Sequence, residues 1–279
     1  MMHPSVYTWR FLNTHFGNAF FNMAVDEALV HAVAKGADPV FRVYAWTPPA
    51  ISFGYAQHVG REIDPEKCRQ KNIDIVRRST GGRAVLHWNE LTYSVICKID
   101  DPSLGGSIQE AYRNISSGLL AGLELLNILA TLESRRLAQP SPRGKELTSP
   151  CFTSTAQYEI TYQGRKLIGS AQQRIGNVLL QHGSLLLGPE HKQMIDLLPA
   201  GKEILRDRFQ YELDQHTLSL SEIVRSDISV DMIAQALRQG LLNTFPITFT
   251  DADLTVEERA ETQCLIVEKY STTGWNFKH

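Results

Sequence analysis

The sequence predicts an α+β fold in which a strand-rich region with two long helices precedes a helical C-terminal part. Apolar residues recur at helical spacing in residues 18–35 and 107–126, so each stretch is expected to form a helix with one apolar face. Short apolar or alternating runs, bounded by Gly, Pro and Asn, predict strands between and after these helices. Two Ser/Thr-x-x-Glu patterns, at 219–222 and 255–258, resemble capping boxes and predict the start of C-terminal helices.

In the first half of the chain, strands are expected to follow and precede the two helices. The apolar stripe of the first helix includes Val25 and Leu29, whereas Asn22 and Asp26 lie off or beside it. An Asp-Pro pair at residues 64–65 predicts a short helix that ends near residue 72. The strands expected in this half are residues 40–44, 51–55, 73–78, 91–98 and 128–132.

A tyrosine-rich hairpin is predicted where residues 158–162 and 165–168 flank a Gln-Gly pair that fits a two-residue turn. In this register Ile160 opposes Leu167. Thr161 opposes Lys166, which then shares a face with Ile168. Beyond the hairpin we expect a strand at 178–187, a short helix at 191–198, a charged and irregular stretch at 201–217, and helices that begin near 219, 230 and 255.

Composition excludes several classes of function. The chain has 279 residues and a net charge near −2, so no overall basic field argues for nucleic acid. No run of about 18 apolar residues occurs, so we expect no membrane span. The first residues lack the basic and apolar regions of a signal peptide. We therefore expect a cytoplasmic protein that binds neither nucleic acid nor membrane, and we expect it to be a monomer.

The four cysteines do not form a metal or disulfide pattern, because they contain no CxxC pair and no zinc-site spacing. Cys68, Cys97 and Cys264 lie in apolar helix or strand contexts and are expected to be small buried residues. Cys151 differs because it follows Pro150 at the end of a long polar loop, where a thiol can be reached.

Three other features have both a bland and a functional interpretation. The strand that ends in Gly81 and Gly82, with arginines on both sides, could bring backbone N–H groups close to a ligand, although a Gly-Gly pair alone is usually a tight turn. It is neither a P-loop nor a GxGxxG turn. Lys166 on a strand is usually a solvated side chain. His182 could be a site residue, but a buried histidine with satisfied hydrogen bonds is the more common case.

A thiol and an amine together suggest one chemistry. A thiolate is a strong nucleophile, and a nearby ammonium lowers the pKa of the thiol by stabilising the anion. Cys151 and Lys166 could therefore serve acyl transfer through a thioester, with no metal and no cofactor. An acyl thioester donor is already activated, so such a reaction needs no ATP.

Three motifs resemble the biotin/lipoate protein ligase superfamily. They are Arg77-Arg-Ser-Thr-Gly-Gly-Arg-Ala-Val-Leu-His87, Gly164-Arg-Lys-Leu-Ile-Gly-Ser-Ala-Gln172 and Leu180-Gln-His-Gly-Ser-Leu-Leu-Leu187. The resemblance covers most of the chain and implies a central mixed or antiparallel β-sheet flanked by helices. It also implies a catalytic domain over residues 1–249, with its core at about 35–249, on which a C-terminal helix at 250–279 packs.

Within the superfamily the chain resembles the octanoyltransferases, mainly through Ser149-Pro-Cys151-Phe. The resemblance implies transfer of an octanoyl group from octanoyl-acyl carrier protein to a lipoyl-domain lysine of glycine cleavage protein H. Cys151 would be the nucleophile, and Lys166 would lower its pKa. The substrate pocket would be lined by Arg77, Gly81, Gly82, Arg83, Ala84, His87, Gly169, Ser170, Ala171 and His182.

Three alternatives stay open on the sequence. An ATP-dependent lipoate or octanoate ligase would use Lys166 without the thiol, and a non-enzymatic acyl or cofactor binder would retain only the fold. Cys151 argues against both. An amidotransferase that moves octanoate from protein H to dehydrogenase subunits also uses a cysteine, and the Trp275-Asn-Phe-Lys278 terminus disfavours it only weakly.

Overall fold

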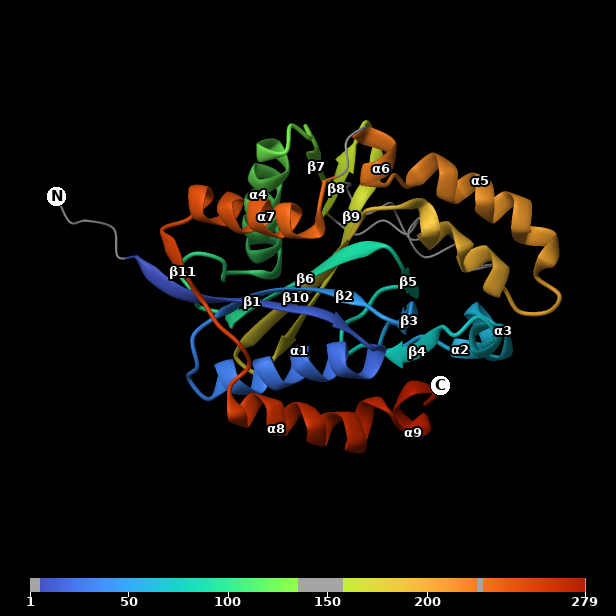
Figure 1. The fold of residues 1–279 in the computed structure, drawn as a ribbon, viewed down its shortest axis with the longest axis horizontal. Helices are drawn as coiled ribbons and strands as arrows, with labels where there is room; N and C mark the ends of the chain where they lie inside the picture. The colour runs from blue at the N-terminus through green and yellow to red at the C-terminus, as the bar shows by residue number, and fades with distance from the viewer. Residues whose placement is uncertain (1–5, 135–157, 225–227, 279) are drawn as a thin grey trace.

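A computed structural model describes residues 6–134, 158–224 and 228–278, and its centre is a mixed eight-stranded sheet with helices on both faces (Figure 1). The strand order is β11-β1-β2-β6-β10-β9-β8-β7, with the first three strands parallel and the others antiparallel. The strands are β1 (Tyr7–Gly17), β2 (Val40–Trp46), β6 (Glu90–Lys98), β7 (Thr131–Ser134), β8 (Tyr158–Tyr162), β9 (Arg165–Ile175), β10 (Val178–Leu186) and β11 (Ile247–Asp251). The expected helix-flanked mixed sheet is thus confirmed.

A second, three-stranded sheet lies beside one end of the large sheet (Figure 1). Its order is β4-β3-β5, from β3 (Ala50–Phe53), β4 (Asp74–Arg77) and β5 (Val85–His87). The loop between β4 and β5 carries the two glycines singled out in the sequence. The helices are α1 (Ala19–Ala34), α2 (Val59–Glu62), α3 (Pro65–Gln70), α4 (Ile108–Leu125), α5 (Arg206–His216), α6 (Leu220–Ile223), α7 (Val230–Thr244), α8 (Val256–Leu265) and α9 (Thr273–Asn276), with 3₁₀ turns η2 (Pro189–Leu197) and η3 (Glu203–Leu205) and a π turn η4 (Ile266–Tyr270).

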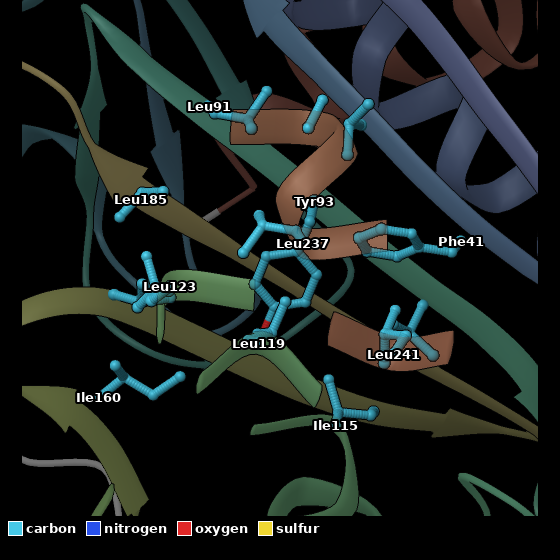
Figure 2. Close-up of a cluster of buried hydrophobic side chains, with 14 of the residues drawn as sticks. Phe41, Leu91, Tyr93, Ile115, Leu119, Leu123, Ile160, Leu185, Leu237 and Leu241 are labelled. Carbon is cyan, nitrogen blue, oxygen red and sulfur yellow. The ribbon is translucent and has the colours of Figure 1, made fainter. Parts of the chain in front are cut away.

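The main hydrophobic core lies between one face of the large sheet and the pair α4 and α7 (Figure 2). Leu119 and Leu123 of α4 and Leu237 of α7 meet side chains from the central strands, such as Phe41 and Tyr93. The two helices cross at glycines, which lets their backbones approach closely. Both capping boxes predicted from the sequence are present, at α6 and α8.

The opposite face of the sheet is covered by α1, with α8 packed outside it (Figure 1). This face is polar over part of β2, β6 and β10, where Arg42, Ser94 and His182 point toward α1. Asn22 and Asp26 are therefore buried, although they lie outside the apolar stripe. In α1 both the apolar stripe and these polar residues are buried, because the sheet that α1 packs against supplies hydrogen-bond partners.

Three strands, β1, β5 and β11, were not expected from the sequence. β1 and β2 are parallel because α1 crosses over between them. β11 pairs with the other edge of β1 and lies in a region that the sequence predicts to be helical. β11 is a short edge strand with mostly exposed side chains, so it lacks the apolar alternation that identifies a half-buried strand.

Three other expectations are wrong. Residues 201–217 are not irregular, because α5 forms there and buries Phe209 and Leu213. Cys264 is exposed on α8 and is not a buried residue. The hairpin register contains a bulge: Thr161 does pair with Lys166, but Ile160 pairs with Ile168 and not with Leu167.

The C-terminal segment is tied to α1 and β1 by ion pairs. Lys269 of η4 lies 2.6 Å from Glu27 of α1, and Arg10 of β1 pairs with Glu258 of α8 at 2.5 Å. A division into a catalytic domain at 1–249 and a packing helix at 250–279 remains a proposal.

Within the described ranges, no helix combines the length and apolar character that a membrane crossing requires.

Candidate functional site

A cavity of about 190 Å³ lies between the polar face of the large sheet, the small sheet and the start of α1. Its walls combine apolar and aromatic side chains with hydroxyl, imidazole and amine groups, which is the usual composition of a small-molecule site. The lining residues are Met23, Tyr44, Trp46, Ser52, Arg78, Gly82, Arg83, Val85, His87, Thr92, Lys166, Gly169, Ser170, Ala171, His182, Gly183 and Ser184.

The glycine loop between β4 and β5 forms one wall of the cavity. Gly82 has a φ of +96°, which favours glycine, and a Cβ on Gly54 would lie 2.0 Å from the Gly82 carbonyl oxygen. The Arg78 guanidinium is 5% exposed and donates to the carbonyl oxygens of Gly81 and Arg83. Because all these partners are backbone groups of one loop, Arg78 fixes the loop shape.

His182 joins this loop to α1. Its Nε2 lies 2.7 Å from Thr80 Oγ1 in the loop, and its Nδ1 lies 3.1 Å from Asp26 Oδ2. Burial lowers the pKa of His182 although Asp26 opposes this, so the imidazole is neutral near pH 7. A neutral ring that donates from Nδ1 to the carboxylate has Nε2 left to accept from Thr80.

Asp26 is the centre of a buried polar network. Burial would raise its pKa, but the Arg42 charge and the His182 contact together lower it below the usual value. Arg42 Nη1 donates to Oδ1 at 2.6 Å, and the hydroxyls of Ser94 and Tyr44 donate at 2.7 and 3.1 Å. The carboxylate therefore stays ionised. It connects α1 to the sheet through Arg42 and to the glycine loop through His182.

Lys166 enters the cavity from β9 because of the bulge. In a regular hairpin Lys166 would share the core face with Ile168. In the structure Leu167 is the extra residue of the bulge, and both Leu167 and Ile168 pack in the main core. Lys166 therefore turns away from the core and lines the cavity. Its Nζ lies 2.7 Å from Glu159 Oε1, and Lys166 is 8% exposed. The structure thus holds this amine inside a buried ion pair, in contrast to a solvated strand lysine.

Comparison with known proteins decides the family. The model of the Lipoyl protein ligase A/B catalytic domain matches residues 18–242. Curated proteins called Octanoyltransferase LipM are similar over nearly their whole length: that of Kyrpidia tusciae is 39% identical over 97% of this chain and 99% of that protein, and that of Staphylococcus aureus is 37% identical over 97% and 99%. The chain belongs to the lipoyl protein ligase A/B catalytic-domain family. It is an acyltransferase similar to these enzymes.

A solved structure agrees with this lipoyl protein ligase fold. The bi-partite lipoate protein ligase from Thermoplasma acidophilum, which was studied together with its E2 lipoyl domain, has a TM-score of 0.79 and 25% identity over 97% of this chain and 96% of that chain.

In this family member, most residues predicted for the site, Lys166 among them, line the cavity. They are Gly82, Arg83, His87, Lys166, Gly169, Ser170, Ala171 and His182. Gly81 is in the same loop but does not line the cavity, and Ala84 is buried in a separate core cluster. Cys151 lies outside the described residues.

Arg77 points away from the cavity and holds the C-terminus. Its guanidinium donates to the carbonyl oxygens of Gly54, Trp275 and Asn276, while Asn276 Oδ1 accepts from the Arg77 backbone N–H. Arg77 is fully buried, so these bonds replace the water that a guanidinium normally binds. These hydrogen bonds connect the C-terminal segment to the end of β4, just before the glycine loop.

Several cavity residues were not predicted from the sequence, notably Ser52, Trp46 and Ser184, and neither was the ion-pair partner Glu159. A lone carboxylate in the otherwise uncharged strand 158–162 was a signal that could have indicated Glu159, because a buried charge needs a partner. Ser52 and Ser184 gave no comparable signal, since single serines occur on many strands.

The three thiols with described positions, Cys68, Cys97 and Cys264, are poor nucleophiles or lie away from the cavity. Burial raises the pKa of Cys68 to about 12 and also raises that of Cys97. Cys264 is exposed on α8 and does not line the cavity. Among the residues with described positions, no three His, Cys, Asp or Glu side chains gather to hold a metal ion.

Proposed function

We propose that this acyltransferase moves an octanoyl group from octanoyl-acyl carrier protein to a lipoyl-domain lysine of glycine cleavage protein H, through a thioester on Cys151. The observation that carries the proposal is the similarity to curated octanoyltransferases over nearly the whole chain, with 39% identity over 97% of the chain in one case. The sequence around Cys151, which follows Pro150 after a polar stretch, and the buried Lys166 in the cavity support it further.

In the proposed mechanism, Lys166 acts on the thiol through its charge. A cation near a thiol favours the thiolate, and the thiolate attacks the acyl thioester. The apolar cavity lining, with Met23, Trp46 and Val85, would hold the alkyl chain. Each buried methylene contributes about 0.8 kcal/mol, so each one missing from the acyl group weakens binding by about three- to fourfold. One site serves both carriers, so ping-pong kinetics are expected.

The test is acyl-enzyme formation. Incubation with octanoyl-acyl carrier protein, without ATP or Mg²⁺, should add one octanoyl group, detected by intact-protein mass spectrometry. Cys151→Ala should form no adduct, whereas Cys264→Ala, which removes an exposed thiol of α8, should form it normally. An adduct that persists in Cys151→Ala would refute the nucleophile.

A chase with acceptor domains separates the remaining alternatives. Transfer from the acyl-enzyme to protein H supports the proposal, whereas a donor requirement for octanoyl-protein H indicates the amidotransferase. Strict dependence on ATP with free octanoate or lipoate would indicate a ligase. A cytoplasmic location, a monomeric state and the absence of a cofactor remain predictions.

A further inference from the structure

Three side chains in the cavity wall form a linear hydrogen-bonded array. Ser52 Oγ lies 2.7 Å from His87 Nε2, and His87 Nδ1 lies 2.7 Å from Glu90 Oε1. Ser52 and His87 line the cavity, while Glu90 lies behind them on β6 and is 4% exposed. The three residues come from β3, β5 and β6, so both sheets contribute to the array.

The surrounding groups fix the direction of these hydrogen bonds. Arg78 Nη1 can only donate, and it lies 3.0 Å from Ser52 Oγ. The hydroxyls of Thr92 and Ser184 donate to Glu90 Oε1 at 2.6 and 2.7 Å, which requires that this oxygen accepts. His87 must then donate from Nδ1.

A neutral His87 ring that donates from Nδ1 carries its lone pair on Nε2, which can then accept from the Ser52 hydroxyl. The Trp46 ring stacks on His87 with a centroid separation of 4.0 Å and an interplanar angle of 11°, which fixes the imidazole plane. A Ser hydroxyl has two acceptor lone pairs, and Arg78 uses one. The second can accept a hydrogen from a group in the cavity.

Aminolysis of a thioester needs a base, because the acceptor lysine is an ammonium at neutral pH with a pKa of about 10.4. Lys166 does not serve this purpose, since its amine is in an ion pair with Glu159. We propose that Ser52, His87 and Glu90 form the proton relay that deprotonates the acceptor amine, a role that rests on the proposed octanoyl transfer. Ser52 would be the group that touches the amine, and Glu90 is a positioning residue.

The acceptor ammonium gives one proton to Ser52 Oγ, whose own proton passes to His87 Nε2, and Glu90 stabilises the imidazolium. The neutral amine then attacks the thioester carbonyl carbon, and as the C–N bond forms the nitrogen releases its second proton to solvent. The C–S bond breaks and the electron pair leaves on sulfur. The imidazolium then returns its proton to the thiolate through Ser52.

The experiment measures the two half-reactions separately in Ser52→Ala and Glu90→Gln. Formation of the octanoyl adduct should stay within about twofold of the parent rate, whereas transfer to the lipoyl-domain lysine should fall by about 100-fold, the size of a general-base effect. Transfer to hydroxylamine, which is a neutral nucleophile at pH 7, should be retained. Raising the pH toward the lysine pKa should restore much of the lysine transfer.

A matched control is Ser116→Ala, which removes a buried hydroxyl on α4 outside the cavity and should change neither half-reaction. Unchanged lysine transfer in both relay variants would overturn the relay. So would an equal loss with lysine and hydroxylamine, because this would indicate damage to the cavity and not to proton removal. Failure of the parent protein to form any octanoyl adduct would instead refute the proposed function, and the relay with it.

Discussion

The Lys166 amine lies 2.7 Å from Glu159 Oε1 across the β8–β9 hairpin, and both side chains are 9% exposed. A buried ammonium is costly unless it is paired, so Glu159 makes it possible to keep a positive charge in this cavity. The bulge in β9 directs the amine toward the cavity and away from the core. The pair therefore supplies the fixed cation that the proposed thiolate chemistry needs.

Lys166→Ala should raise the pKa of the Cys151 thiol by about one unit or more, because the stabilising cation is lost. The rate of alkylation against pH should shift upward by this amount. The measurement requires a Cys264→Ala background, since the exposed Cys264 thiol would be alkylated too. Lys35→Ala, at the exposed end of α1, is the control. An identical pH profile with and without Lys166 would remove it from this role.

The Lys166–Glu159 pair should also show energetic coupling. A double-mutant cycle would combine Lys166→Met and Glu159→Gln. Each single variant leaves one buried charge without its partner, so its loss in unfolding free energy should exceed half of the loss in the double variant. The resulting coupling energy should be about 2 kcal/mol. Urea unfolding measures the four free energies. A coupling energy below about 0.5 kcal/mol would place this pair with ordinary surface ion pairs.

Gly54→Ala should displace the glycine loop. A Cβ at this position would lie 2.0 Å from the carbonyl oxygen of Gly82, and a backbone atom cannot move aside as a flexible side chain can. We expect a loss of about 1–3 kcal/mol in unfolding free energy and a clear loss of acyl transfer. Gly60→Ala, where nothing lies within 4 Å of the new Cβ, should be nearly neutral. Equal effects of the two substitutions would contradict this.

Asn276→Ala tests the hydrogen bonds between the C-terminal segment and Arg77 of β4. The substitution removes the acceptor for the Arg77 backbone N–H and the donor to the Tyr270 carbonyl, both of which are buried. We expect a cost of about 1–3 kcal/mol, measured by chemical unfolding. The exposed Asn243→Ala is the comparison and should cost less than about 0.5 kcal/mol. A neutral Asn276→Ala would mean that the C-terminal turn does not stabilise β4.

The long helices α1 and α4 and most strands could be predicted because their apolar spacing is local, whereas α5 was missed. The pairing of Thr161 with Lys166 also followed from the hairpin turn. The bulge at Leu167 did not, because it depends on which side chains the core accepts, and this is set by α4 and the neighbouring strands. The direction of Lys166 therefore needed the tertiary structure.

The polar part of the site was harder to predict for a related reason. Asp26, His87 and His182 are far apart in sequence, and their partners come from different strands and from the glycine loop. No local pattern distinguishes Ser52 or Glu90 from other strand residues. The family motifs indicated the loop and the strands that line the cavity, but the hydrogen-bonded arrays form only when both sheets meet.

Acid should destabilise the protein through His191. Burial lowers its pKa to about 4, against about 6.5 in an unfolded chain. Between these values the unfolded state binds one more proton than the folded state, so the contribution is complete above pH 6.5 and is lost as the pH falls toward 4. The loss amounts to about 3 kcal/mol, and His182, whose pKa is also lowered, adds to it in the same direction.

His191→Gln should therefore flatten the fall in unfolding free energy between about pH 6.5 and 4, measured by urea unfolding at a series of pH values. The substitution also removes the contact of Nε2 with Thr217 Oγ1, which lowers stability by a similar amount at every pH and leaves the slope as the diagnostic quantity. His216→Gln removes an exposed histidine and should leave the slope unchanged. If the two variants have the same slope, the buried imidazole is not the group that titrates on unfolding.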